Sequence, residues 1–395
     1  MSSTIQWLWL TTKQGITPHK IAKLMEAYGS IEEIYKRTSY NVRGLTRAET
    51  DRLLDKSLDT ARQTFQNVLD CGASILTCDN KFYPECLRNI SPMPYVLYMK
   101  GTPVNFDKIL GIGIVGTRLN TDYGAKCAYN ISYGLGERGA VIISGMALGI
   151  DSIAMHAAVK AGAYVIGVLG CGIDIVYPQS NDWLFREITK TGLIISEYPP
   201  GTRAFPGNFP QRNRIIAGLS KGVLVIEGAK SSGSMITARL ALEYNRDLYA
   251  VPRCIGDVNA KGIPMDGTNH LIRDGAKLTL NAEDILCEYE YMPIEKRKPK
   301  KKIRKEQPPA EETPKHEEKT TETNTEQADV ERLIEKTNSD IERSVIMLLK
   351  GRGKYADEIV RELDGEIGSA GVTLTLMETM GFLKRGADGR YELNI

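Results

Sequence analysis

The stretch "DKILGIGIVGTR", residues 107–118, decides which kind of α/β fold the chain adopts. Gly111, Gly113 and Gly116 have the spacing G-x-G-x-x-G, which in a dinucleotide-binding protein lies in the turn after the first strand. Too few apolar residues precede Gly111 for a strand to end there. We therefore expect the strand to run through the first two glycines and to end at Val115, which leaves only Gly116 in the turn.

A second requirement of the dinucleotide fingerprint also fails. The next strand should end in an acidic residue that holds a ribose hydroxyl. Here that strand runs into Ser144 and Gly145, and Asp151 follows only at the start of a helix. A dinucleotide-dependent oxidoreductase is therefore disfavoured, and no cofactor is expected.

Outward from this stretch, residues 109–275 alternate between short apolar runs and helical segments. Short buried strands joined by helices predict an α/β fold with a doubly wound parallel sheet. The loops that follow parallel strands meet at one edge of the sheet, where such folds bind ligands. The runs predicted as strands are 109–115, 141–143, 164–169, 193–196, 223–226 and 248–251.

The residues before this core predict short helices. Apolar side chains recur at a helical period in 17–35, with a break at Gly29, and Thr46 and Glu49 have the spacing of a capping box. Small helices joined by glycine turns are typical of a sterile-alpha-motif or helix-hairpin-helix module. Such a module either contacts DNA backbone or protein or serves only as a helical packing cap, and the packing cap is the favoured interpretation. Residues 82–101 predict an extended segment that leads into the core.

The residues after the core divide into two parts. Residues 291–338 run from basic to acidic without an apolar period, which predicts a disordered charged linker. Residues 339–395 predict three helices and a β-hairpin, the winged-helix pattern. The third of these helices, 368–380, contains no lysine or arginine, which favours a structural or protein-contact role over reading duplex DNA. The expected domains are a helical module at 1–80, a core at 81–290, the linker, and a winged helix at 339–395.

Composition sets limits on the environment of the protein. The net charge of +2 indicates no particular partner, and seven cysteines are scattered without a C-x-x-C pair. That spacing argues against a zinc site or a disulfide framework and predicts a reduced, cytoplasmic protein. Apolar runs stay below the roughly 18 residues of a membrane span, so a membrane is not an expected partner. The four histidines are scattered as well, so no metal is expected.

Groups that suit a phosphate follow several of the predicted strands at the shared edge. Small residues let backbone N–H groups approach an anion closely, and arginine or lysine balances its charge. Each group alone is ordinary, because an arginine after a strand is usually solvated and Ser-Gly-Ser often only caps a helix. Their convergence on one edge is more specific. The candidates are Gly116, Thr117, Arg118, Ser144, Gly145, Arg212, Arg214, Lys230, Ser232, Gly233 and Ser234.

The core closely resembles the DNA-processing protein A family (DprA, also called Smf). The matching segments follow the family's order over residues 109–280, and "RNRIIAGLS" followed by "SGSMITA" is the most specific pair. The resemblance implies a Rossmann-like core that binds nucleic acid and not a nucleotide cofactor. The other segments are "GIVGTRLNTDYG", "ISGMALGIDSIAMHAA", "GVLGCGIDIVYPQSN", "GLIISEYPPGTRAF" and "GIPMDGTNHLIRDGA".

The resemblance also implies a function and a site. It implies a non-catalytic protein that binds and protects single-stranded DNA and loads the RecA recombinase onto it in natural transformation and recombination. A homodimer through the core domain is implied as well. Arg118 would grip a DNA phosphate, with Ser144 and Gly145 as nearby donors. The other residues implied to line the groove are Phe209, Arg212, Asn213, Arg214, Ser232, Gly233 and Ser234.

One departure and one alternative remain. Some family members have a lysine in the loop before "RNR", where this chain has Pro206, with Arg203 as the nearest replacement cation. The alternative function is a nucleotide phosphoribohydrolase of the lysine-decarboxylase-like (LOG) type. Those enzymes need the glutamate of a P-G-G-x-G-T-x-x-E motif, and residues 228–241 contain no acid in its place.

Overall fold

The structure is a computed structural model that describes residues 3–291, 337, 340–350, 353–355, 358–359, 362, 374, 377–378, 382–386 and 390–394. The chain divides into two compact units, Met1–Lys296 and Arg297–Ile395. Apart from residues 291 and 337, the predicted linker 291–338 lies outside the described residues. Within the described part, no helix is long and apolar enough to cross a membrane.

The first unit is built on a nine-stranded sheet in the order β1-β2-β6-β5-β4-β3-β7-β8-β9. Neighbouring strands are parallel from β6 to β9, whereas β2 pairs antiparallel with β6 and β1 pairs antiparallel with β2. The strands are β1 (Ser74–Thr77), β2 (Val96–Gly101), β3 (Gly111–Val115), β4 (Val141–Ser144), β5 (Val165–Leu169), β6 (Leu193–Ser196), β7 (Gly222–Val225), β8 (Asp247–Ala250) and β9 (Lys277–Leu278).

The six strands predicted from apolar runs are confirmed as β3 to β8. The prediction of a purely parallel sheet was incomplete, because β1 and β2 add an antiparallel flank. β1 lies in the range predicted for the helical module, and β2 lies in the segment predicted to be extended. The register of β2 joins Tyr98 to Ser196, so this pairing depends on a partner far along the chain.

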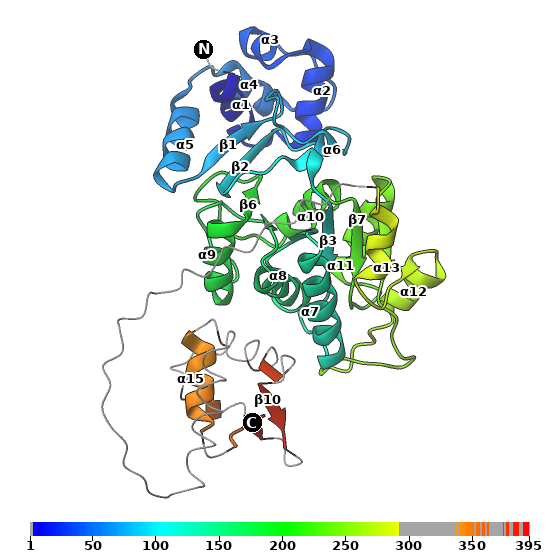
Figure 1. The fold of residues 1–395 in the computed structure, drawn as a ribbon. Helices are drawn as coiled ribbons and strands as arrows, with labels where there is room; N and C mark the ends of the chain where they lie inside the picture. The colour runs from blue at the N-terminus through cyan, green and yellow to red at the C-terminus, as the bar shows by residue number, and fades with distance from the viewer. Residues whose placement is uncertain are drawn as a thin grey trace, which may run out of the picture. The chain divides into compact units, whose positions relative to one another are not determined.

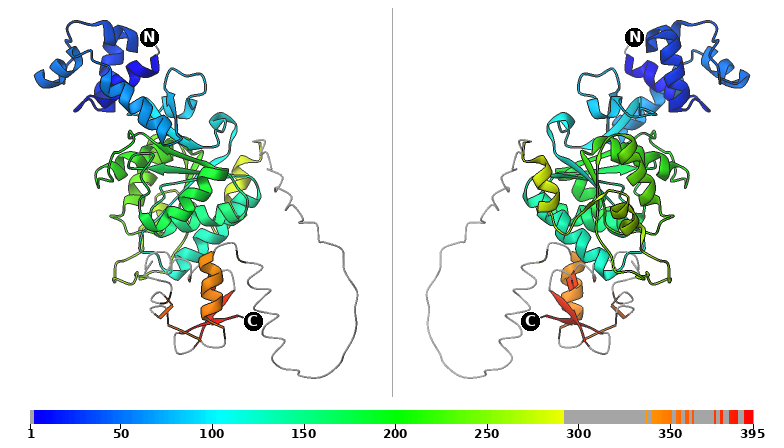
Figure 2. Two further views of the ribbon diagram at one scale, coloured as in Figure 1. Left: turned by 90° about the vertical axis from the view of Figure 1, so that its left-hand side faces the viewer. Right: turned by 90° about the vertical axis from the view of Figure 1, so that its right-hand side faces the viewer.

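Helices cover both faces of the sheet (Figures 1 and 2). Helices α7, α8 and α9 connect successive strands from β3 to β6 and pack side by side, whereas α10 and α11 pack against each other. Because parallel crossovers are right-handed and the chain moves outward from β3 in two directions, the two groups lie on opposite faces. The helices of the core are α7 (Asp122–Glu137), α8 (Ile150–Lys160), α9 (Asp182–Thr191), α10 (Asn208–Leu219), α11 (Gly233–Glu243), α12 (Gly267–Arg273) and α13 (Glu283–Leu286).

The direction of winding reverses between the adjacent strands β3 and β7. β3 leads through α7 to β4 on one side, and β7 leads through α11 to β8 on the other. The loops after β3 and β7 therefore separate at the carboxyl edge of the sheet. Doubly wound folds bind their ligands at such a point.

The three spaced glycines of residues 111–116 serve close packing. Strand β3 includes Gly111 and Gly113 and ends at Val115, as predicted. A Cβ atom at Gly113 would lie 2.7 Å from Ser220 Oγ, and one at Gly116 would lie 2.6 Å from the Cβ of Ile150. The glycines thus let neighbouring helices and loops approach the central strand.

The N-terminal residues form a helical module that precedes the sheet (Figure 1). The predicted capping box is confirmed: Thr46 Oγ1 accepts a hydrogen bond from the Glu49 N–H at 3.3 Å, and Glu49 Oε2 accepts one from the Thr46 N–H at 3.0 Å. The likeness to a sterile-alpha-motif or helix-hairpin-helix module stays a prediction. Its helices are α1 (Ser3–Thr12), α2 (Pro18–Tyr28), α3 (Ile31–Lys36), α4 (Arg47–Leu54) and α5 (Asp59–Asp70), and the short α6 (Glu85–Arg88) follows between β1 and β2.

The second unit contains helix α15 (Asp340–Leu348) and an antiparallel hairpin of β10 (Leu383–Arg385) and β11 (Tyr391–Leu393). Buried side chains from the helix and the hairpin share one apolar cluster, which includes Val345, Ile346 and Leu383. The first predicted helix and the predicted hairpin are therefore present. The second and third predicted helices lie largely outside the described residues, so the winged-helix assignment stays a prediction.

Candidate nucleic-acid interface

A cavity of about 460 Å³ opens at the carboxyl edge of the sheet, where the winding reverses. It is bounded by the loop after β3 and by the first turns of α10 and α11. Segments far apart in the sequence thus meet around one space. The predicted site residues that line it are Gly116, Thr117, Arg118, Phe209, Arg212, Asn213, Ser232, Gly233 and Ser234.

A stack of three side chains forms one wall of the cavity. The exposed Arg118 guanidinium lies over the Phe209 ring at 5.4 Å from its centroid. On Phe209 stacks Tyr177, with 5.3 Å between ring centroids and an interplanar angle of 29°. The stack therefore combines a cation that can meet a phosphate with aromatic faces that can meet a base.

Tyr177 was not among the predicted site residues. It lies in the loop after β5, in the segment "GCGIDIVYPQSN", and its side chain is exposed although it is large and aromatic. An aromatic residue in a loop at the carboxyl edge is the sequence signal that could have identified it. Its position beside Phe209 depends on the fold, because the two residues belong to different crossovers.

Two helix N-termini border the same cavity. Gly207 and Ser232 precede α10 and α11, and in the described structure neither residue caps its helix with a side-chain hydrogen bond. At the start of α11 the N–H groups of Gly233 and Ser234 can therefore donate to an anion, which the helix dipole also favours. At the start of α10 the Asn208 N–H already donates to the Phe205 carbonyl at 2.9 Å, and Pro210 has no N–H. The hydroxyls of Ser232 and Ser234 lie 2.6 Å apart, and the Thr237 hydroxyl, which also borders the cavity, has no hydrogen-bond partner within the described residues.

Arg212 forms the floor of the cavity and is almost fully buried. Its guanidinium donates hydrogen bonds to the carbonyls of Gly145 and Val168, which links the ends of β4 and β5. A Cβ atom at Gly145 would collide with this guanidinium, so the glycine makes room for it. Burial lowers the pKa of Arg212 to about 10, while the charge of Asp151 acts in the opposite direction.

Asp151 is the buried counter-charge to Arg212. Its carboxylate accepts a hydrogen bond from the Gly145 N–H at 3.1 Å. Burial raises the pKa of this carboxyl, and the nearby Arg212 charge opposes that rise. The Asp151 bond from the Gly145 N–H and the Arg212 bonds to the Gly145 and Val168 carbonyls therefore hold the turn after β4 in place beneath the cavity.

Four predicted site residues do not line the cavity. Ser144 is buried and donates to the Ile114 carbonyl at 2.6 Å, and Gly145 lies below Arg212. Arg214 is buried and donates to Glu197 at 2.6 Å, whereas Lys230 is exposed outside the lining. The structure thus brings together Arg118 and Arg212 but not all four predicted cations. Among the described lining residues, Arg118 is the exposed cation and Arg212 the buried one.

His156 also lies in a segment that matches the family pattern. The side chain is buried and packs edge-on against Trp183, with 4.7 Å between ring centroids. Burial lowers the pKa of this histidine to about 3, so the imidazole is neutral at physiological pH. This environment agrees with a packing role.

Comparison with known proteins identifies relatives of the whole core. Residues 74–290 match the family described as DNA recombination-mediator protein A. The chain is 34% identical over 304 residues to Protein Smf of Synechocystis sp., an alignment that covers 74% of this chain and 75% of that protein. It is 41% identical over 217 residues to the DNA processing protein DprA of Bacillus subtilis, which covers 55% of this chain and 71% of the relative. The crystal structure of DprA from Streptococcus pneumoniae superposes with a TM-score of 0.64 at 33% identity and covers 73% of this chain and 99% of that chain.

Proposed function

Because this chain belongs to the DNA recombination-mediator protein A family, we propose that it binds single-stranded DNA in the cavity between β3, α10 and α11. The observation that carries the proposal is the stack of Arg118, Phe209 and Tyr177 beside two helix N-termini. Relatives of this chain carry the name DNA processing protein.

The chemistry of the cavity suits an unpaired strand. Phosphates would meet Arg118 and the N–H groups at the start of α11. A base that is free of its pair could stack on Tyr177 or Phe209, and such stacking contributes roughly 1–3 kcal/mol per base. A duplex keeps its base faces covered, so the aromatic wall favours single strands. Few lining groups are placed to read base edges, and we expect little sequence preference.

Fluorescence anisotropy with labelled oligo-dT tests this function. We expect the protein to bind oligo-dT more tightly than a duplex of the same length. Affinity should fall as salt rises, because bound phosphates release counterions, with a log–log slope of roughly −0.7 per phosphate contact. Equal affinity for the duplex, or affinity that does not depend on salt, would refute binding in this cavity.

The family is one of DNA-binding proteins without catalytic activity, in agreement with the sequence-based prediction that the chain is not an enzyme. The arrangement of acids also disfavours the alternative LOG-type phosphoribohydrolase. Among the described residues that line the cavity, the one acidic residue is Asp151. Its carboxylate is buried near Arg212 and accepts a hydrogen bond from the Gly145 N–H. A carboxylate held in this way is poorly placed to act on a ribose.

The bound strand, in our proposal, is protected and passed to the RecA recombinase during natural transformation and recombination in the cytoplasm. The family description as a recombination mediator supports this step. We expect the protein to shorten the lag of RecA filament assembly on a single strand coated with single-strand-binding protein. An unchanged lag at saturating protein would refute the loading step and leave DNA binding intact.

A homodimer through the core domain is the last part of the proposal. Large apolar side chains are exposed on the loop after β8 and around β9: Ile255, Val258, Ile263, Leu278 and Leu280. Exposed apolar patches of this kind mark protein interfaces. We expect Leu280→Asp to shift the protein from dimer to monomer in sedimentation velocity, and a monomeric wild-type protein would refute the assignment.

A further inference from the structure

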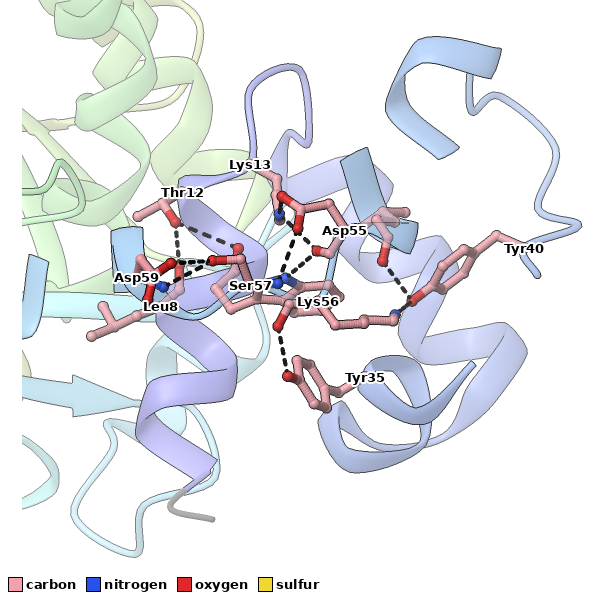
Figure 3. Close-up of polar contacts among 11 residues, drawn as sticks. Leu8, Thr12, Lys13, Tyr35, Tyr40, Asp55, Lys56, Ser57 and Asp59 are labelled. Atoms are coloured by element: carbon pink, nitrogen blue, oxygen red, sulfur yellow. Dashed lines mark hydrogen bonds and ion pairs between the residues drawn. The ribbon is translucent and has the colours of Figure 1, made fainter. Parts of the chain in front are cut away.

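The amine of Lys56 in the N-terminal module is enclosed by three aromatic rings. Its Nζ atom lies 4.8 Å from the ring centroid of Trp9, 4.8 Å from that of Tyr40 and 5.5 Å from that of Tyr35. Figure 3 shows the Lys56 side chain extending to Tyr40. The Tyr35 hydroxyl donates a hydrogen bond to the Lys56 backbone carbonyl at 2.8 Å. The lysine is therefore fixed at both its backbone and its amine.

The hydrogen bonds around this amine run in one direction. Lys56 Nζ donates to the Tyr40 hydroxyl oxygen, and that hydroxyl donates its own proton to the Ile34 carbonyl at 2.6 Å. The phenol consequently has no proton left for the nitrogen. When the amine is neutral, its lone pair is free to react.

The nearest carboxylate to Lys56 in the sequence is already paired with another lysine. The carboxylate of the preceding residue, Asp55, pairs with Lys13 at 2.9 Å, and Lys13 also lies 5.6 Å from the Trp9 ring centroid. Burial and the Lys13 charge lower the pKa of Lys56 to about 8, with Asp55 acting against them. The other titratable groups nearby are the phenols of Tyr28, Tyr35 and Tyr40 and the Asp59 carboxylate, which accepts from Ser57.

The Lys56 side chain keeps part of its surface in solvent. Lys56, Tyr35 and Tyr40 are half-buried, in contrast to the fully buried Trp9. A nucleophilic lysine combines these features: partial removal from water, a neighbouring cation and an unshared lone pair.

We propose that Lys56 is an acylation site for activated acyl donors of the acyl phosphate class. The lone pair of the neutral amine attacks the acyl carbon and forms the C–N bond. The C–O bond to phosphate breaks, phosphate leaves with the bonding pair, and the surplus amine proton passes to solvent. The product is a neutral amide, which no longer presents a cation to the rings of Trp9, Tyr35 and Tyr40.

The full-length protein can be treated with limiting acetyl phosphate between pH 6.5 and 9.5 and the modified lysines quantified by peptide mass spectrometry. Lys36 serves as the internal control, because it is exposed and, among the residues that the structure describes, its ion pair is with Glu33 on its own helix. We expect the Lys56 rate to reach half its maximum near pH 8 and to exceed that of Lys36 roughly tenfold at pH 7.5. The advantage should vanish in guanidinium chloride, where the burial and the nearby Lys13 charge that lower the pKa of Lys56 are lost. A Lys56 rate equal to or below that of Lys36 in the native protein would overturn the proposal.

The variant Lys13→Met adds a directional test. It removes the neighbouring positive charge and frees the Asp55 carboxylate, and both changes stabilise the Lys56 ammonium. Acylation of Lys56 should therefore slow at pH 7.5, with its half-maximum moved to higher pH. A faster reaction in this variant would contradict the proposed electrostatics, and the comparison of native with unfolded wild-type protein decides the case if the variant does not fold.

Discussion

Replacing Arg118 by alanine is expected to weaken binding of single-stranded DNA by about 1–3 kcal/mol, roughly 5- to 140-fold. The change removes the exposed cation of the cavity wall and the charged group that lies over Phe209 at 5.4 Å. A charge-assisted hydrogen bond to phosphate is lost, and the salt dependence should become shallower by about one phosphate contact. Arg118 is exposed, so the variant should unfold at the same temperature as the wild type.

Anisotropy titrations with oligo-dT at several salt concentrations measure both effects. The matched control is Arg138→Ala, which also removes an exposed arginine but from the end of α7, where the side chain pairs with Glu283. The control should bind within about twofold of the wild type. If Arg118→Ala binds as tightly as Arg138→Ala, the assignment of the groove to the loop after β3 is wrong.

Arg212→Met is expected to lower the free energy of unfolding by about 3–5 kcal/mol, the largest loss we anticipate from a single substitution. The methionine fills similar space but leaves the buried Asp151 carboxylate without its counter-charge. The carbonyls of Gly145 and Val168 also lose the donor that satisfies them. Loss of DNA binding should follow from this unfolding and not from a missing phosphate contact.

The pH dependence of this loss has a definite sign. Burial already raises the pKa of Asp151, and removing the Arg212 charge raises it further. A carboxyl whose pKa is higher in the folded state stabilises that state at low pH and loses the contribution as pH rises above its unfolded value near 3.9. The difference in free energy of unfolding between the wild type and Arg212→Met should therefore be smaller at pH 5 than at pH 8.

Chemical unfolding followed by circular dichroism at pH 5, 6.5 and 8 tests this prediction. The control is Arg203→Met, which removes an exposed arginine from the loop before α10 and should cost less than about 0.5 kcal/mol. If the loss of unfolding free energy in Arg212→Met grew toward low pH, the electrostatic coupling of Arg212 to Asp151 would be contradicted. If Arg212→Met lost no more unfolding free energy than Arg203→Met, the Arg212 charge would not stabilise the folded protein.

The sequence by itself determined those features that depend on neighbours along the chain. Apolar runs separated by helical periods predicted β3 to β8, and the short apolar lead before Gly111 showed that two of the three glycines lie inside a strand. The capping box at Thr46 and Glu49 was predictable for the same reason, because its two hydrogen bonds join residues three positions apart.

Only the tertiary structure decided which charges face solvent and which strands extend the sheet. The sequence does not distinguish Arg118, Arg212 and Arg214, because all three are arginines near predicted loops. In the structure Arg118 is exposed, whereas the buried Arg212 donates to backbone carbonyls and the buried Arg214 donates to Glu197. β2 is paired by a strand that lies almost a hundred residues away, and Tyr177 meets Phe209 across two crossovers. Such contacts form only when distant segments fold together, so they cannot be predicted from the residue types of one local segment.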